Sequence, residues 1–210
     1  MKRFACTFAL LLCATAAAPA VADLWWPANS TIPSRITIVG WSGARPDAAV
    51  GQFEVVVRDL ANNPVPGSVV VIDFSSLPEV HLASDQMDAA VLTNCAQHSV
   101  RRFTDAAGRA VFTVMGHGGN ATLAPGPLRA HIYADGVLLG SPLVAILDVD
   151  GSGGAGANDV ALFLDSFALP QPPGCFDYDG SEFVGANDLA VWLNAAGLAG
   201  SAVTAPGICP

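Results

Sequence analysis

Apolar and polar residues alternate along residues 33–147, and the alternation is clearest in residues 52–58. Turn-forming residues such as Asp135-Gly136 separate the apolar stretches, and no helical period occurs in this part of the chain. The pattern predicts short strands at residues 35–39, 52–58, 68–74, 99–103, 109–115, 128–134, 137–139 and 143–147. Such a series of short strands is typical of a mainly β protein, and we expect an antiparallel β-sandwich over residues 23–147.

Three motifs in this region consist of a strand, or of a turn that leads into a strand. They read Phe53-x-Val55-x-Val57-x-Asp59, Asn63-Pro64-Val65-Pro66-Gly67-x-x-Val70 and Thr104-Asp105-x-x-Gly108-x-Ala110-x-Phe112. With them the region resembles bacterial immunoglobulin-like domains of the invasin and intimin (Big-1) type. The resemblance implies an immunoglobulin-like fold and carries over no catalytic residue. Residues 75–98 depart from the compact family pattern, either as a binding loop or as an idle insertion.

The periodicity changes after residue 147, where two segments carry apolar residues at the spacing i, i+3, i+4, i+7. Each segment predicts one amphipathic helix. The residues concerned are Val160, Phe163, Leu164 and Phe167 in the first segment, and Leu189, Trp192, Leu193 and Ala196 in the second.

An acidic loop precedes each of these helices, and the two loops are offset by 29 residues, since 177 − 148 = 29 and 188 − 159 = 29. Each loop has aspartates at positions 1, 3 and 12, a hydroxyl at position 5 and a backbone carbonyl at position 7, which is the oxygen-ligand spacing of a calcium loop. The candidate ligands are Asp148, Asp150, Ser152, Gly154 and Asp159 in the first loop, and Asp177, Asp179, Ser181, Phe183 and Asp188 in the second. We expect two Ca²⁺ sites; the alternative is two Asp/Gly-rich turns that bind nothing.

Only the outgoing helix of an EF-hand is present in each copy, because a predicted strand precedes Asp148. With its two loop–helix units, residues 147–200 resemble a type I dockerin module. The resemblance implies a calcium-binding module, residues 148–210, that docks onto a cohesin-like or other extracellular protein. It also implies partner contacts at loop positions 10 and 11, on a face with near two-fold symmetry. These positions hold Ala157, Asn158, Ala186 and Asn187.

The chain departs from the dockerin pattern at three points. Positions 10 and 11 lack the common hydroxyl residues, and the predicted helices carry no basic residue. Glu182 stands where the loop turns sharply and a glycine is expected, and a non-glycine residue at positive φ costs about 1 kcal/mol. We therefore expect the second calcium site to be the weaker one.

The N-terminus and the charge indicate an exported acidic protein. Residues 1–22 have a basic start, an apolar run and a small-x-small site ending at Ala22, and so predict a cleaved signal peptide with no membrane span in the mature chain. Removal of Lys2 and Arg3 leaves 7 Arg against 18 acidic residues, a formal charge of −11, and no lysine. This balance argues against nucleic acid and anionic membranes as partners and favours hard cations.

Three cysteines remain after cleavage, and export permits a disulfide. Cys175 and Cys209 bracket the second loop and its helix, so we expect them to pair. Cys95 is then left as a buried or a free thiol, or it is the true partner of one of the others.

No catalytic constellation emerges, since His81, His98, His117 and His131 are scattered. We expect a secreted, non-catalytic modular protein that displays its β-sandwich through the docking module. The alternative is a carbohydrate-binding or small polysaccharide-degrading component of an extracellular complex. Its support is residues 75–98 and the tandem Trp25-Trp26, which could equally cover one end of the core.

Overall fold

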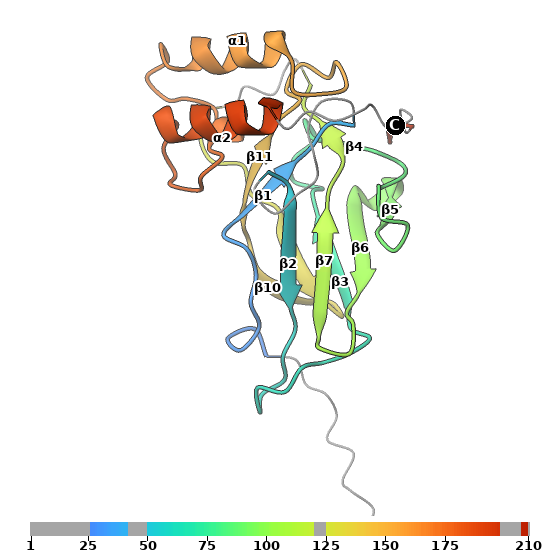
Figure 1. Cartoon of the computed structure of the whole chain (residues 1–210). Coiled ribbons are helices and arrows are strands. Elements are labelled where there is room, and N and C mark those ends of the chain that lie inside the picture. Colours follow the sequence, from blue (N-terminus) through green and yellow to red (C-terminus); the bar gives the residue numbers. More distant parts are fainter. Residues whose placement is uncertain (1–25, 42–49, 120–124, 198–206, 210) are drawn as a thin grey trace, which may run out of the picture.

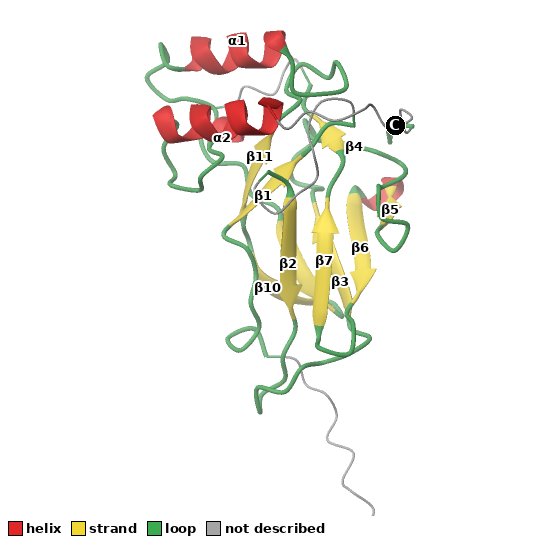
Figure 2. Ribbon diagram, in the orientation of Figure 1, coloured by secondary structure: helices red, strands yellow, loops and turns green. Residues whose placement is uncertain are grey.

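The computed structural model describes residues 26–41, 50–119, 125–197 and 207–209, so the expected signal peptide and Trp25 lie outside the described residues. The described chain is mainly β, with two α-helices near its C-terminal end (Figure 2). The strands are β1 (Arg35–Ile38), β2 (Gln52–Val56), β3 (Val69–Asp73), β4 (His81–Leu82), β5 (Leu92–Asn94), β6 (Ser99–Phe103), β7 (Arg109–Thr113), β8 (Gly116–His117), β9 (His131–Ala134), β10 (Val137–Gly140) and β11 (Leu143–Ile146). The helices are α1 (Ala157–Ser166) and α2 (Ala186–Gly197), and two 3₁₀ turns are η1 (Cys95–Gln97) and η2 (Gly174–Phe176).

One layer is a five-stranded sheet in the order β10-β9-β3-β6-β5, and all of its neighbouring strands are antiparallel. In its central strand Val70 and Ile72 are fully buried, whereas Val71 between them is only partly buried. The alternation seen in the sequence therefore marks an inner and an outer face of this sheet.

The opposite layer is built from strand pairs (Figure 1). β2 pairs with β7 and β4 pairs with β8, both antiparallel, but β1 pairs with β11 in parallel. The expectation of an entirely antiparallel sandwich is therefore wrong at β1–β11. Thr31 forms an isolated antiparallel bridge with Val56 of β2. A few residues later the chain forms β1, which pairs with β11 instead. A parallel pair is possible there because about half of the chain lies between the two strands and can form the long connection that parallel strands need. With this arrangement the molecule is consistent with a β-rich, immunoglobulin-like fold.

A single hydrophobic core joins the sandwich and the helices. Phe112 of β7 and Ile132 of β9 belong to the same cluster as Phe163 of α1 and Tyr178. The Tyr178 hydroxyl donates a hydrogen bond to the Ile146 carbonyl of β11 over 2.8 Å, and its ring stacks on Phe163. α1 and α2 thus pack onto one end of the sandwich, side by side and in opposite directions (Figure 1).

The buried side of each helix is narrower than the sequence predicts. Phe163 and Trp192 are buried as expected, but Leu164, Phe167 and Leu193 are 49%, 45% and 55% exposed. Each helix therefore buries only part of its apolar side, although other apolar residues of the helices are partly buried against the core, namely Val160, Leu162, Leu189, Val191 and Ala196.

The expected Cys175–Cys209 disulfide is also wrong. Cys95 bonds to Cys209, with their Cα atoms 5.1 Å apart, and Cys175 is a buried free thiol. Cys175 lies in η2, which packs against β11, whereas residues 207–209 return to the sandwich, where the Cys209 amide donates to the Leu82 carbonyl. The chain path, and not nearness in sequence, decides which sulfurs come within bonding distance.

Within the described ranges, neither helix has the length and apolarity that crossing a bilayer requires.

Candidate metal centres

The first acidic loop brings three carboxylates to one point. Asp148 follows β11, and Asp159 lies in the first turn of α1. Together with Asp150 they offer oxygens that all lie within 4.8 Å of one another, and Asp148 and Asp159 are fully buried. Such a cluster repels itself unless protons or a cation neutralise it.

The position-12 aspartate of this loop holds the loop backbone. Its Oδ1 accepts hydrogen bonds from the amides of Val149 and Asp150, at 2.7 and 3.0 Å, and its Oδ2 accepts one from Gly156 at 2.7 Å. At the other end, Oδ2 of Asp148 accepts from the amide of Gly153 at 2.8 Å. The loop is therefore preformed around its acidic side chains.

The second loop repeats this network. Oδ1 of Asp188 accepts from the amides of Tyr178 and Asp179, at 2.6 and 3.0 Å, and its Oδ2 accepts from Gly185 at 2.7 Å. The oxygens of Asp177, Asp179 and Asp188 also lie within 4.8 Å of one another. The 29-residue repeat of the sequence is thus a repeat of hydrogen-bonded structure.

One atom distinguishes the first loop. Oδ1 of Asp148 is buried and has no hydrogen-bond partner among the described residues. Burial raises the pKa of Asp148 to about 7, and the negative charges of Asp159 and Asp150 act in the same direction. A buried acceptor that faces like charges is the environment in which a bound cation would remove both penalties.

The remaining predicted ligands lie in the same loops. The hydroxyl of Ser181 donates to the carbonyl of Phe183 over 3.0 Å, so these two position-5 and position-7 groups are adjacent. In the first loop the Ser152 amide donates to Oδ1 of Asp150 at 2.9 Å. Gly154 lies against Gly40, so closely that a Cβ atom on Gly40 would be 2.7 Å from the Cα atom of Gly154. All candidate donors are oxygens, and oxygen donors suit a hard cation such as Ca²⁺.

Positive charge lies close to the second loop. Burial lowers the pKa of the Arg35 guanidinium, although the charges of Asp177, Asp179 and Asp188 act in the opposite direction. Nη1 of Arg35 is itself buried without a hydrogen-bond partner among the described residues. This neighbouring charge reduces the attraction of the second loop for a cation.

Glu182 adopts the conformation that the sequence predicts, with φ of 64°. Its equivalent in the first loop, Gly153, has φ of 111°. The Glu182 carboxylate also receives a hydrogen bond from Arg129 at 2.8 Å. The left-handed conformation at this loop position is therefore common to both copies, but only the first copy has the residue that adopts it without strain.

The four predicted partner-contact residues are exposed. Ala157 and Asn158 begin α1, and Ala186 and Asn187 begin α2, so the two pairs lie at opposite ends of the antiparallel helices (Figure 1). The pKa of Asp179 is lowered, first by the Ser181 side chain, and the Asn187 side chain acts in the same direction. Asn187, at position 11 of the second loop, therefore lies beside the acidic cluster of that loop.

Sequence reasoning missed two histidine contacts. Nδ1 of His131 lies 2.8 Å from the Ser141 hydroxyl, and the rings of His81 and His117 stack with centroids 5.0 Å apart. His81 and His117 come together because β4 pairs with β8. Those strands have two residues each, too few to show an alternating pattern. Desolvation, followed by the charges of His117 and His98, lowers the pKa of His81.

Comparisons with known proteins give little guidance to function. No model of a protein family matches the chain, and no curated protein does. Among solved structures, one similar protein is the Yersinia pseudotuberculosis adhesin InvE, with 20% sequence identity and a TM-score of 0.28. The similarity covers 59% of this chain and 28% of the adhesin chain, so it extends over little more than a quarter of the adhesin structure.

Proposed function

We propose that this chain is a secreted, non-catalytic modular protein in which two calcium loops shape a helical docking module that displays an immunoglobulin-like β-sandwich. The observation that carries the proposal is the convergence of three aspartates in each loop, within the same hydrogen-bond network. In addition, Oδ1 of Asp148 is buried and has no hydrogen-bond partner in the part of the chain that the structure describes. The docking role rests on the dockerin-like spacing of residues 147–200.

In this proposal Ca²⁺ supplies charge neutralisation for carboxylates that would otherwise repel one another. Asp148, Asp150 and Asp159 hold the first ion with Ser152 and the Gly154 carbonyl; the corresponding residues of the second loop hold the other. The chain itself keeps the loops ready, because Asp159 and Asp188 already bind the backbone amides at loop positions 2, 3 and 9. Neutralised loops would fix the start of each helix.

The proposed docking surface comprises Ala157, Asn158, Ala186 and Asn187. All four are exposed, and so are three apolar residues nearby: Leu164 in α1, Phe167 directly after α1, and Leu193 in α2. The described module carries acidic residues but no Lys, Arg or His, so a partner with basic residues around an apolar centre would fit it. A cohesin-like or other extracellular protein is the proposed class of partner.

Surface plasmon resonance against a panel of immobilised cohesin domains, in Ca²⁺ and then in chelator, tests this function. We expect binding that is lost in chelator and weakened by Asn158→Lys/Asn187→Lys, which places positive charge opposite the basic residues of the partner. Thr37→Ser in β1 serves as the control. Binding that persists in chelator, or that the asparagine variants leave unchanged, would refute calcium-dependent docking.

A carbohydrate-binding role is the second candidate, because Trp26, whose amide donates to the Arg58 carbonyl, is 42% exposed. Aromatic rings offer large apolar faces that can cover a sugar ring. Retention on insoluble polysaccharide that is lost in Trp25→Ala/Trp26→Ala would favour this role over docking. Equal retention of the variant and the parent chain would remove it.

A further inference from the structure

A hollow of about 410 Å³ lies on the outer face of the five-stranded sheet, and we call it the β3 hollow. It runs along β3 from Gly136, in the turn between β9 and β10, to Ser75 beyond the other end of β3. Its volume falls in the range of about 300–1,000 Å³ in which protein pockets hold small ligands. Other lining residues are Val71, Asp73, Gln97, Ser99 and Tyr133.

The register of the sheet brings an aromatic ring and a carboxylate to this face. Tyr133 of β9 lies beside Val71 of β3, and Asp73 of β3 lies beside Ser99 of β6. Side chains two positions apart on a strand share a face, so Val71 and Asp73 both belong to the outer one. The β3 hollow therefore has an aromatic wall in its middle and polar groups towards one end.

The long segment of residues 75–98 borders that polar end. Ser75 is its first residue and Gln97 is close to its last, and both line the hollow. The Ser75 amide donates to Oδ1 of Asp73 over 2.8 Å, and the Asn94 side chain donates to Oε1 of Gln97 over 2.8 Å. These bonds hold both ends of the segment at the hollow, which favours a binding loop over an idle insertion.

The Tyr133 ring is held in place by its neighbour. His131 meets it at an angle of 63°, with ring centroids 6.4 Å apart, and Nδ1 of His131 lies 2.8 Å from the Ser141 hydroxyl. Among the described residues, neither the Tyr133 hydroxyl nor Oδ2 of Asp73 takes part in a hydrogen bond. The ring is thus positioned in advance, while polar groups beside it stay open to a ligand.

We propose that the β3 hollow binds a neutral oligosaccharide. The Tyr133 ring offers an apolar face that can cover one sugar ring. The Ser75 hydroxyl and the Gln97 amide both donate and accept hydrogen bonds, and the Asp73 carboxylate accepts them, so together they match sugar hydroxyls. The site goes beyond the proposed docking function and does not depend on it.

Two other classes of ligand suit the hollow less well. β3 already pairs with β6 and with β9, so an extended peptide finds no free strand edge to pair with. The chain has 18 acidic against 9 basic residues, and Asp73 lies in the hollow itself, so acidic sugars are disfavoured. A neutral sugar needs neither a strand edge nor a positive charge.

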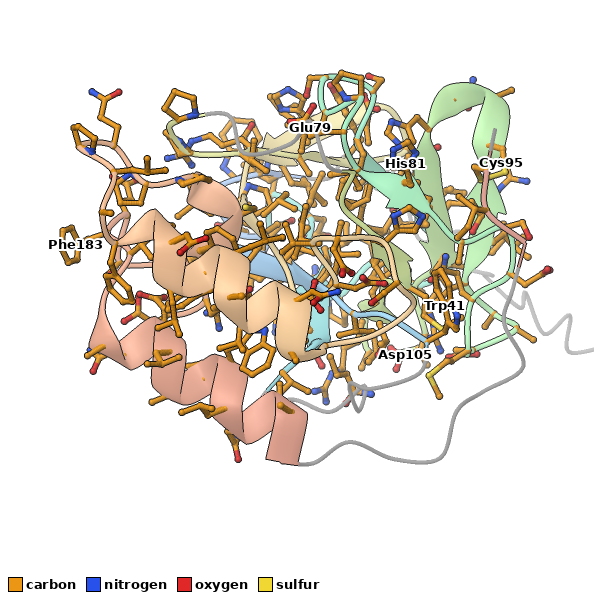
Figure 3. All side chains as sticks on the ribbon, turned by 90° about the horizontal axis from the view of Figure 1, so that it is seen from above. Trp41, Glu79, His81, Cys95, Asp105 and Phe183 are labelled. Carbon is orange, nitrogen blue, oxygen red and sulfur yellow. A yellow bond between two sulfur atoms is a disulfide. The ribbon has the colours of Figure 1, made fainter. Side chains whose placement is uncertain are left out.

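The hollow is separate from the other proposed binding surfaces. Figure 3 shows Cys95, which belongs to residues 75–98, and Phe183 of the second acidic loop on opposite sides of the molecule. Trp26 does not line the hollow, and its backbone bonds to Arg58 instead. Sugar binding at the β3 hollow and at the tryptophans can therefore be told apart by substitution.

Isothermal titration of cellohexaose, xylohexaose and mannohexaose into the full chain, kept in saturating Ca²⁺, tests the proposal. Tetragalacturonate is the acidic comparison. We expect at least one neutral sugar to bind, tetragalacturonate not to bind, and the affinity to fall at least tenfold in Tyr133→Ala and in Asp73→Ala. Phe103→Ala should bind like the parent chain. It is a matched control because Phe103 is 60% exposed in β6 of the same sheet but does not line the hollow.

Three results would overturn the site. They are no binding of any neutral sugar, tighter binding of tetragalacturonate, and equal losses in Phe103→Ala and Tyr133→Ala. Loss of binding in Trp25→Ala/Trp26→Ala, with Tyr133→Ala unaffected, would place the sugar at the tryptophans and overturn it as well.

A second measurement covers the case in which a substitution disturbs folding. The chain has two tyrosines, Tyr133 and the fully buried Tyr178. In ¹⁹F spectra of the chain labelled with 3-fluorotyrosine, the bound sugar should shift the Tyr133 signal and leave that of Tyr178 in place. An unchanged Tyr133 signal, or equal shifts of both, would count against the site. Failure of the calcium or cohesin experiments would leave both sugar readouts unaffected.

Discussion

The Asp148 carboxyl group is fully buried next to two other aspartates of its loop. Its pKa is raised to about 7, mainly by burial, so the folded ion-free chain favours its protonated form. The stability that this group contributes is fully present below its unfolded pKa of about 3.8 and is lost as the pH rises through about 7. Bound Ca²⁺ would hold the carboxylate ionised and remove this loss.

We therefore expect the melting temperature of the chain in chelator to fall between about pH 5 and pH 8, and to fall less in Asp148→Asn. Differential scanning calorimetry of both proteins measures the difference, in which other titrating groups cancel. Asp150→Asn is the control, because Asp150 is only partly buried and its pKa is lowered. Parallel pH profiles for the parent chain and Asp148→Asn would contradict the account of this residue.

Glu182 offers a test of strain in the second loop. Replacement by glycine removes a non-glycine side chain at φ of 64° and loses an exposed ion pair with Arg129. Exposed ion pairs contribute little, so we expect Glu182→Gly to stabilise the chain by up to about 1 kcal/mol. Urea denaturation measures this change, with Glu182→Ala as the comparison. A destabilised glycine variant would show that the ion pair outweighs the strain.

At the scale of elements, α1 has one buried aromatic residue, Phe163, and a second aromatic residue, Phe167, follows its last residue at the surface. Phe163 is fully buried and contacts Phe176 and Tyr178, whereas Phe167 is 45% exposed. We expect Phe163→Ala to cost about 3–5 kcal/mol and Phe167→Ala about 1 kcal/mol, as measured by urea denaturation. Similar costs for both would mean that α1 buries the wider face that its sequence spacing suggests.

Strand positions were largely predictable from the sequence, because strands that bury one face show alternation. Residues 99–103 were predicted with the bounds of β6, and β2, β3 and β7 lie inside the predicted ranges. β4, β5 and β8 were not predicted, since strands of two or three residues leave no periodic signal. β4 and β8 form by pairing with each other from distant parts of the chain, and β5 forms by pairing with the nearby β6.

The acidic clusters were predictable and the histidine pair was not, for a related reason. The three aspartates of each loop lie within 12 positions and repeat, so their spacing alone places them together. His81 and His117 meet only through β4–β8 pairing. Cys95 and Cys209 are likewise 114 residues apart and meet only because the chain returns to the sandwich.

At the scale of the whole molecule, the Cys95–Cys209 disulfide ties the C-terminus to the sandwich and encloses both acidic loops. Peptide mapping without reduction should find this pair and a free Cys175. Burial raises the pKa of Cys175 to about 12, so its thiol should react with a thiol reagent only after unfolding. Recovery of a Cys175-containing disulfide, or rapid labelling of Cys175 in the folded chain, would contradict this arrangement.

The same disulfide and the continuous core link the two parts of the chain energetically. Closing a loop of about 100 residues restricts the unfolded chain by up to about 5 kcal/mol. Cys209→Ala should therefore lower the melting temperature of the sandwich and the helices together. Calorimetry would show one shifted transition; two separate transitions would show that the parts unfold independently.

The measurement that tests the central claim most directly is calcium titration of the chelator-treated chain by isothermal calorimetry, with the parent chain and Asp159→Asn/Asp188→Asn compared. We expect the parent chain to bind two Ca²⁺ ions, the second more weakly because Arg35 and Glu182 lie in or beside its loop. The variant should bind neither ion with comparable affinity. A parent chain that releases no heat of binding and melts identically in Ca²⁺ and in chelator would contradict the account.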